Sequence, residues 1–164
     1  CDYSKGVSNS IDVLMLQNLQ MDSMNEILEI RKIFEPEVAA IVAKVAKPSE
    51  IDILIESLAK MREALAIENF KERASKMFME ADTQFHMSLL SFTNNKLMNL
   101  LLAPLFEKIS ELQLAHLTIF DTAGEASFKA HERIITSIQN RNPIIARKEM
   151  EIHITNVQKD FNSL

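Results

Sequence analysis

Apolar residues recur every three or four positions along most of the chain, and polar residues fill the positions between them. This spacing predicts amphipathic helices rather than strands. The first helix is expected over 23–46, with Ser23 as its N-cap and Pro36 as a kink or break inside it. Its apolar stripe is predicted from the spacing of Ile27, Ile30, Phe34, Val38, Ile41 and Val45.

Five more helices are expected, at about 51–65, 70–93, 95–120, 125–140 and 143–161. Asn94 suits a left-handed C-terminal cap, and Asn95 suits the N-cap of the helix that follows. Asn142 before Pro143 is the pattern of an N-cap with a proline in the first helical turn. The pattern as a whole predicts an all-α fold, a single antiparallel bundle of six or seven helices.

Residues 1–20 are expected to form a linker or tail with a candidate short helix, and residues 21–164 one helical domain. The chain is 47% hydrophobic but has only two glycines and one tyrosine, a composition that argues against sheets. No apolar run is long enough to span a membrane, and we expect a cytoplasmic protein. The net charge of −5 and the scattered basic residues exclude a nucleic-acid surface on this chain. Its single cysteine, Cys1, has no internal disulfide partner.

Ligand-type side chains interrupt three of the predicted apolar stripes. Asp82 and His86 lie one turn apart on an otherwise apolar helix face, and His131 and His153 occupy similar positions on the last two helices. A buried carboxylate is costly unless it is paired, protonated or bound to a metal. An aspartate and a histidine one turn apart can both reach one cation, and two further histidines from facing helices can complete a set of four.

Three nitrogen donors and one oxygen donor suit zinc, nickel, iron or manganese. The same residues can also be hydrogen-bonded core histidines beside a simple buried Asp82–His86 pair. His116 lies on an apolar stripe as well, and periodicity alone neither admits it to a site nor excludes it. No pair of Glu-x-x-His motifs indicates a di-iron bundle, and no glycine elbow presents a nucleophilic serine.

Three segments, read in order, carry a family resemblance. Glu29, Arg31, Glu35 and Pro36 match a Glu-x-Arg-x-x-x-Glu-Pro core, and "DTQFHMSLLSFTNN" matches an Asp-x-x-Phe-His segment with an asparagine nine residues after the histidine. The closing block, "HERIITSIQNRNPIIARKEMEIHI", spaces two histidines twenty-two residues apart. Over about residues 22–161 the chain resembles the FadR C-terminal (FCD) effector-binding domain of GntR-type transcription regulators. Asn94 and Arg141-Asn142 replace the glycine and the Gly-Asp that the family usually has there.

The resemblance implies a metal site that leaves His116 out and is formed by Asp82, His86, His131 and His153. It also implies a ligand pocket at the centre of the bundle, with Arg31 and Asn95 as candidates to bind the effector. Arg31 suits a bidentate contact with a carboxylate. Its alternative role is a partly exposed salt bridge with Glu35 or another acid, and the alternative for Asn95 is the helix cap.

We therefore expect a sensor that is not an enzyme: a dimeric effector domain with a divalent transition metal, zinc ranked ahead of nickel, manganese and iron. Its partner is expected to be a small carboxylate metabolite, because one aspartate on a divalent ion leaves a charge near +1 that attracts anions. Operator DNA would bind only through a winged-helix domain, which the family carries ahead of this one and this chain lacks. The alternatives are a metal-dependent enzyme acting on a small carboxylic acid, and a metal-free structural module.

Overall fold

The computed structural model describes residues 24–67, 71–116 and 123–162. Its regular elements there are all helices: α2 (Met24–Val45), α3 (Pro48–Leu65), α4 (Lys71–Phe92), α5 (Lys96–His116), α6 (Ala123–Gln139) and α7 (Pro143–Asn162). The predicted all-α class is confirmed. The expected tail over 1–20 and the expected N-cap at Ser23 lie outside the described residues. Within the described ranges, no helix is long and apolar enough to cross a membrane.

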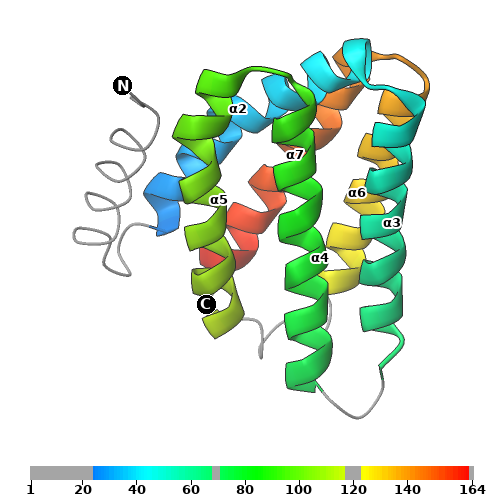
Figure 1. The fold of residues 1–164 in the computed structure, drawn as a ribbon. Coiled ribbons are helices and arrows are strands. Elements are labelled where there is room, and N and C mark those ends of the chain that lie inside the picture. Colours follow the sequence, from blue (N-terminus) through cyan, green and yellow to red (C-terminus); the bar gives the residue numbers. More distant parts are fainter. Residues whose placement is uncertain (1–23, 68–70, 117–122, 163–164) are drawn as a thin grey trace, which may run out of the picture.

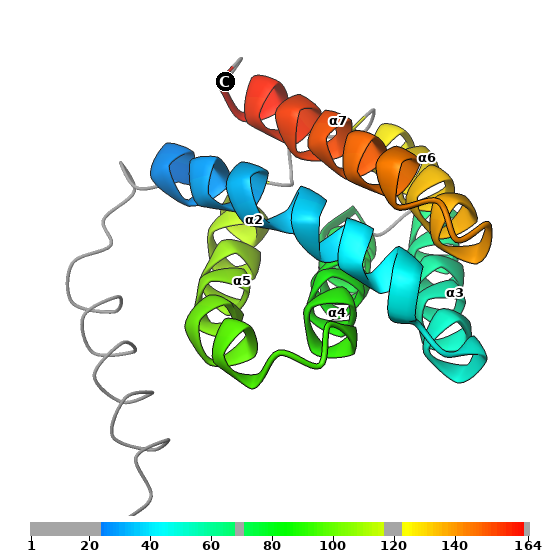
Figure 2. The same ribbon diagram turned by 90° about the horizontal axis from the view of Figure 1, so that it is seen from above.

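The helices form two layers around a shared interior. In Figure 1, α3, α4 and α5 run side by side, and α2 and α7 pass behind them at an angle. The view from above in Figure 2 shows α2 and α7 lying across the other layer. Helix α2 packs along α7, α6 packs against both α7 and α3, and α2 also contacts α4. Side chains from α2, α4, α6 and α7 can therefore meet inside the molecule.

The polar residues between helices act as the predicted caps. Asn94 has a left-handed backbone with φ 56°, and the Met98 backbone N–H donates to Asn95 Oδ1 at 3.0 Å. In the same way the Ile145 N–H donates to Asn142 Oδ1 at 3.1 Å. Arg141 also takes a left-handed conformation, with φ 53°, and completes a Schellman motif at the end of α6.

Two hydrogen bonds define that motif, from the Arg141 N–H to the Ile138 carbonyl at 3.0 Å and from the Asn142 N–H to the Ser137 carbonyl at 2.9 Å. The position usually favours glycine, because a Cβ is strained there. The local turn therefore forms despite the departure from the usual glycine.

Helix α2 agrees with its prediction only in part. Of the kink or break predicted at Pro36, the break is absent, since the helix continues from Met24 to Val45. The predicted apolar stripe is also partly wrong, because Phe34 is 41% exposed and Val45 is 48% exposed. Besides Ile27 and Val38 of that stripe, the buried face carries Arg31, Glu35 and a series of small residues, among them Ala39, Ala40 and Ala43. A prediction from hydrophobicity alone therefore assigned some residues wrongly to the buried face of α2. Alanines are small enough to lie against neighbouring helices, and the two charged residues can be buried because they pair with each other.

Enlarging one of these alanines should destabilise the fold. Ala43 has no exposed surface and belongs to the main core, so Ala43→Leu is expected to lower the free energy of unfolding by about 1–3 kcal/mol. The measurement is urea denaturation followed by circular dichroism. Lys44→Leu, at the exposed neighbouring position, serves as the control and should change stability by less than about 0.5 kcal/mol. Equal effects of the two substitutions would show that this face of α2 is loosely packed.

Candidate metal centre

Three helices bring the four predicted ligand residues together. Asp82 and His86 come from α4, His131 from α6 and His153 from α7, and all four side chains are buried. Each offers one ligand atom, and these atoms all lie within 4.8 Å of one another. Two ligands on opposite sides of one ion, with bonds of about 2.1 Å, would be about 4.2 Å apart. Small side-chain adjustments are therefore enough for all four to reach a single ion.

The closest approaches involve the Asp82 carboxylate and two imidazole nitrogens. Asp82 Oδ1 lies 3.3 Å from His131 Nε2, and Asp82 Oδ2 lies 3.8 Å from His86 Nε2. The two Nε2 atoms are 3.3 Å apart. The ring of His153 stacks on His86 with centroids 5.4 Å apart, and meets His131 edge-on with centroids 4.5 Å apart. The donor atoms therefore face one small space between the three rings.

The backbone of α6 sets the tautomer of His131. Its Nδ1 lies 2.7 Å from the carbonyl oxygen of Ser127, one turn earlier in the same helix. A carbonyl oxygen can only accept, so Nδ1 carries the proton, and the neutral ring has a free lone pair on Nε2. Nε2 is the nitrogen that faces Asp82 and His86.

Glu35 of α2 plays the corresponding part for His86. Glu35 Oε2 lies 2.6 Å from His86 Nδ1. Burial raises the pKa of Glu35, but Arg31 and His86 outweigh it and hold that pKa at about 2, so the group is a carboxylate. The N–H bond is not aligned well enough for a standard hydrogen bond, and Nδ1 has no other partner in the described part of the chain. At this distance an acceptor-only carboxylate still places the proton on Nδ1.

In these tautomers neither His86 nor His131 has a proton on the Nε2 atom that faces the inner space. The Nε2 lone pairs of His86 and His131 point toward each other and toward an Asp82 oxygen, an arrangement that is repulsive unless positive charge lies between them. A proton would serve two of these atoms, whereas a metal ion would serve all four donors. The donor set and its orientation therefore fit a divalent transition metal.

Burial also keeps two of the histidines in the form that binds metals. It lowers the pKa of His131 to about 4, although the Asp82 charge acts in the opposite direction. Burial, reinforced by the neighbouring His131, lowers the pKa of His153 well below its usual value. Both rings are therefore neutral at physiological pH, with lone pairs available to a cation.

The fixed charges in this interior nearly cancel. Arg31 and Glu35 form a buried ion pair, in which Arg31 Nε contacts Glu35 Oε1 and Nη2 lies 3.3 Å from Oε2. With the histidines neutral, Asp82 leaves a local charge of −1, which a divalent ion would change to +1. An anion would then be attracted to the metal.

Arg31 and Asn95, the residues predicted to bind the effector, have other partners in the structure. Arg31 is buried with Glu35, so its alternative role as a salt bridge is observed, although the pair is buried rather than partly exposed. The Arg31 guanidinium also lies 5.7 Å from the centre of the Phe106 ring. Asn95 is exposed and caps α5, and the structure does not bring it into the cluster. The side chain of His116 lies outside the described residues.

Sequence reasoning missed the contacts that Glu35 and Ser127 make with the histidines. The sequence predicts Glu35 only as a partner for Arg31, because its second contact, with His86, depends on how α2 crosses α4. A signal was present, because Glu35 lies on the same helix face as Ile27, Leu28 and Arg31, where an unpaired carboxylate would be costly. The Ser127 contact uses a backbone carbonyl, which no residue type reveals.

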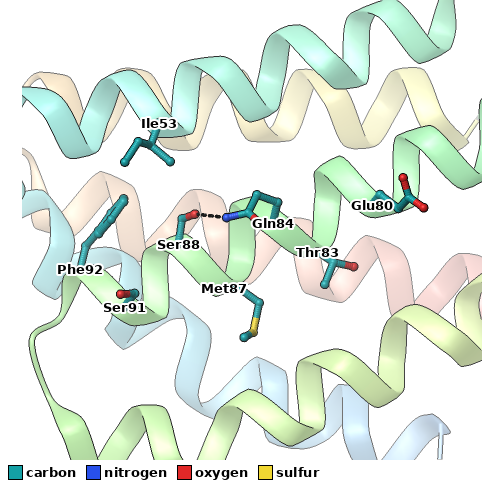
Figure 3. Close-up of a pocket in the computed structure, with 8 residues that line it drawn as sticks. All are labelled: Ile53, Glu80, Thr83, Gln84, Met87, Ser88, Ser91 and Phe92. Atoms are coloured by element: carbon teal, nitrogen blue, oxygen red, sulfur yellow. Dashed lines mark hydrogen bonds between the residues drawn. The ribbon is translucent and has the colours of Figure 1, made fainter.

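A groove of about 580 Å³ lies on the opposite side of α4 (Figure 3). It is lined by Ile53 of α3 and by seven residues of α4: Glu80, Thr83, Gln84, Met87, Ser88, Ser91 and Phe92. Successive helical residues are about 100° apart, so Gln84 points away from the side on which Asp82 and His86 meet the other ligands. This groove is therefore separate from the central ligand pocket that the resemblance implies.

The chain is thus an all-α domain of two crossed layers with a buried Asp-His-His-His cluster. These two features are the basis for its comparison with known families. Residues 26–156 match the family model of the FCD domain. The chain belongs to the FCD family, the effector-binding domains of GntR-family transcription regulators. The resemblance seen in the sequence is confirmed.

Among particular proteins, the chain is similar to the HTH-type transcriptional regulator LutR of Bacillus subtilis (strain 168). The two are 28% identical over 144 residues, which cover 85% of this chain and 63% of that protein. The chain thus spans less than two thirds of its relative. The solved structure of Streptococcus agalactiae GntR matches with a TM-score of 0.75 at 22% identity, over 91% of this chain and 65% of that one, and supports the fold.

Proposed function

We propose that this domain is a metal-containing sensor that binds one divalent transition metal through Asp82, His86, His131 and His153. The observation that carries the proposal is the meeting of two Nε2 lone pairs and a carboxylate oxygen, with no proton donor between them. Zinc ranks first, because neutral imidazoles and a carboxylate are among its common protein ligands and it can expand its coordination beyond four. Nickel, manganese and iron remain the alternatives, since each accepts further ligands beside these four.

The proposed effector is a small carboxylate metabolite. A divalent ion in this cluster would have a net charge near +1, and an ion with more than four coordination positions would have room for carboxylate oxygens. Arg31 is a second candidate contact, although the entering carboxylate would have to compete with Glu35 for the guanidinium. Asn95 is the weaker candidate, since its side chain already caps α5.

Binding would act on DNA indirectly. An effector that prefers one packing of the helices shifts the population toward that packing by the difference in its two affinities. In a dimeric regulator this shift would reposition winged-helix domains outside this chain and change their affinity for operator DNA. The relative in Bacillus subtilis is named as a transcriptional regulator, which favours a sensor over an enzyme that would act on the same acid.

Effector binding should depend on the metal. Short hydroxy acids, sugar acids and dicarboxylates would be tested by calorimetry against metal-loaded protein and against protein stripped with a chelator. At least one acid is expected to bind the loaded protein, and its affinity should fall at least about tenfold on stripping. The amide of that acid is the control and should not bind. Equal affinity for loaded and stripped protein would contradict the proposal, and turnover of the bound acid would favour the enzyme.

A further inference from the structure

We propose that Glu35 is a positioning residue for the metal centre: its carboxylate holds His86 so that Nε2 faces the ion, and it links α2 to the metal through α4. The inference rests on the proposed metal site and extends it to a helix that supplies none of the four ligands. It assigns to the Arg31–Glu35 pair a role beyond stabilising the core.

The division of contacts between the two carboxylate oxygens of Glu35 supports this role. Oε1 contacts Arg31 Nε, whereas Oε2 lies 2.6 Å from His86 Nδ1 and 3.3 Å from Arg31 Nη2. Oε2 is therefore closer to the histidine than to the arginine. Both oxygens contact the guanidinium, so the ion pair is complete without the histidine, and the contact between Oε2 and His86 Nδ1 is additional to it.

The position of the contact on the imidazole ring also matters. A carboxylate on one nitrogen of a ligating histidine fixes the tautomer and ring orientation and makes the other nitrogen a better donor. In His86, Glu35 contacts Nδ1, whereas Nε2 faces His131 and Asp82. Glu35 is therefore on the side of the ring where such a group can act.

Burial makes the arrangement depend on all three partners. The side chains of Arg31, Glu35 and His86 are each at most 3% exposed, so water cannot replace a lost contact easily. Arg31 balances the charge that Glu35 brings into the interior, while Glu35 Oε2 remains in contact with His86 Nδ1. Because Glu35 belongs to α2, metal binding at His86 should also restrain α2 against α4.

The test compares Glu35→Gln with Glu37→Gln, the same chemical change two residues along α2 on an exposed side chain that pairs with Arg147. Zinc affinity would be measured by competition with a chromogenic chelator. Glu35→Gln should weaken zinc binding by roughly 10–100-fold, and Glu37→Gln should leave it unchanged. The visible spectrum of the cobalt-loaded protein should change in Glu35→Gln only, a response that general destabilisation of the fold would not produce.

Since Glu35→Gln leaves Arg31 without its partner, Arg31→Met combined with Glu35→Gln is a second variant that buries no unpaired charge. It should show the same loss of zinc affinity as Glu35→Gln. A third measurement needs no variant: nitrogen NMR of the zinc-loaded wild-type protein should show His86 protonated at Nδ1 and bound to zinc through Nε2.

The outcomes separate the two proposals. Zinc bound with unchanged affinity in both Glu35 variants, or zinc bound to Nδ1 of His86, would overturn the role of Glu35 and leave the metal sensor intact. A wild-type protein that binds none of the candidate metals would overturn the metal site itself, and the role of Glu35 with it.

Discussion

Replacing Asp82 by asparagine, or His131 by alanine, should reduce the metal content of the purified protein from about one ion per chain to near zero. Asparagine has nearly the volume of aspartate but lacks its charge, so Asp82→Asn would remove the only anionic ligand of the proposed set. His131→Ala would remove the ring whose Nε2 lies within 3.3 Å of both His86 and Asp82. The measurement is elemental analysis of protein purified without a chelator or a nickel column.

The matched control is Asp52→Asn, the same change at an exposed aspartate of α3. It should retain the wild-type metal content, and circular dichroism should confirm that all variants are folded. Full metal content in both Asp82→Asn and His131→Ala would refute the site. A wild-type protein purified without metal that also fails to take up zinc, nickel, manganese or iron would favour the metal-free structural module.

Removing the metal should make the protein sensitive to mild acid. Without a bound ion, burial lowers the pKa of His131 to about 4, against 6.5 for an unfolded histidine. Between these values the unfolded chain binds more protons than the folded one, so stability is highest above pH 6.5 and falls as the pH drops toward 4. By pH 5 the loss from His131 alone is roughly 2 kcal/mol. His153, whose pKa is also lowered, adds to it in the same direction.

The free energy of unfolding of chelator-treated protein would be measured by urea denaturation at intervals from pH 7.5 to 5. Ordinary carboxylates titrate below this range, so they contribute little to the change. His131→Gln, which cannot be protonated, should show a shallower decline. In the metal-loaded protein the decline should begin at lower pH, because protons must first displace the ion from its ligands. Stability that stays constant from pH 6.5 to 5 in metal-free protein would mean that these histidines are not buried as neutral rings.

Much of this domain can be read from local pattern. The helical periodicity, the caps at Asn95 and Asn142 and the proline in the first turn of α7 are set by residues within a few positions of one another. Local geometry also places Asp82 and His86 on one helix face, because one turn of helix aligns residues four apart. The four candidate ligands were therefore visible as polar interruptions of apolar stripes, and the resemblance to FCD domains joined them into one set.

The tertiary arrangement added what no local pattern contains. Whether His131 and His153 reach Asp82 depends on how α6 and α7 pack beside α4, and residue spacing within one helix says nothing about packing between helices. The buried face of α2 was misjudged for the same reason, since small alanines and the neutralised Arg31–Glu35 pair suit a close helix contact better than Phe34 or Val45. The proton position on His86 likewise depends on Glu35 from another helix, whereas that on His131 is set within α6 by the Ser127 carbonyl. Periodicity thus shows which face of a helix can be buried, but the chemistry of that face depends on the atoms that the other helices bring to it.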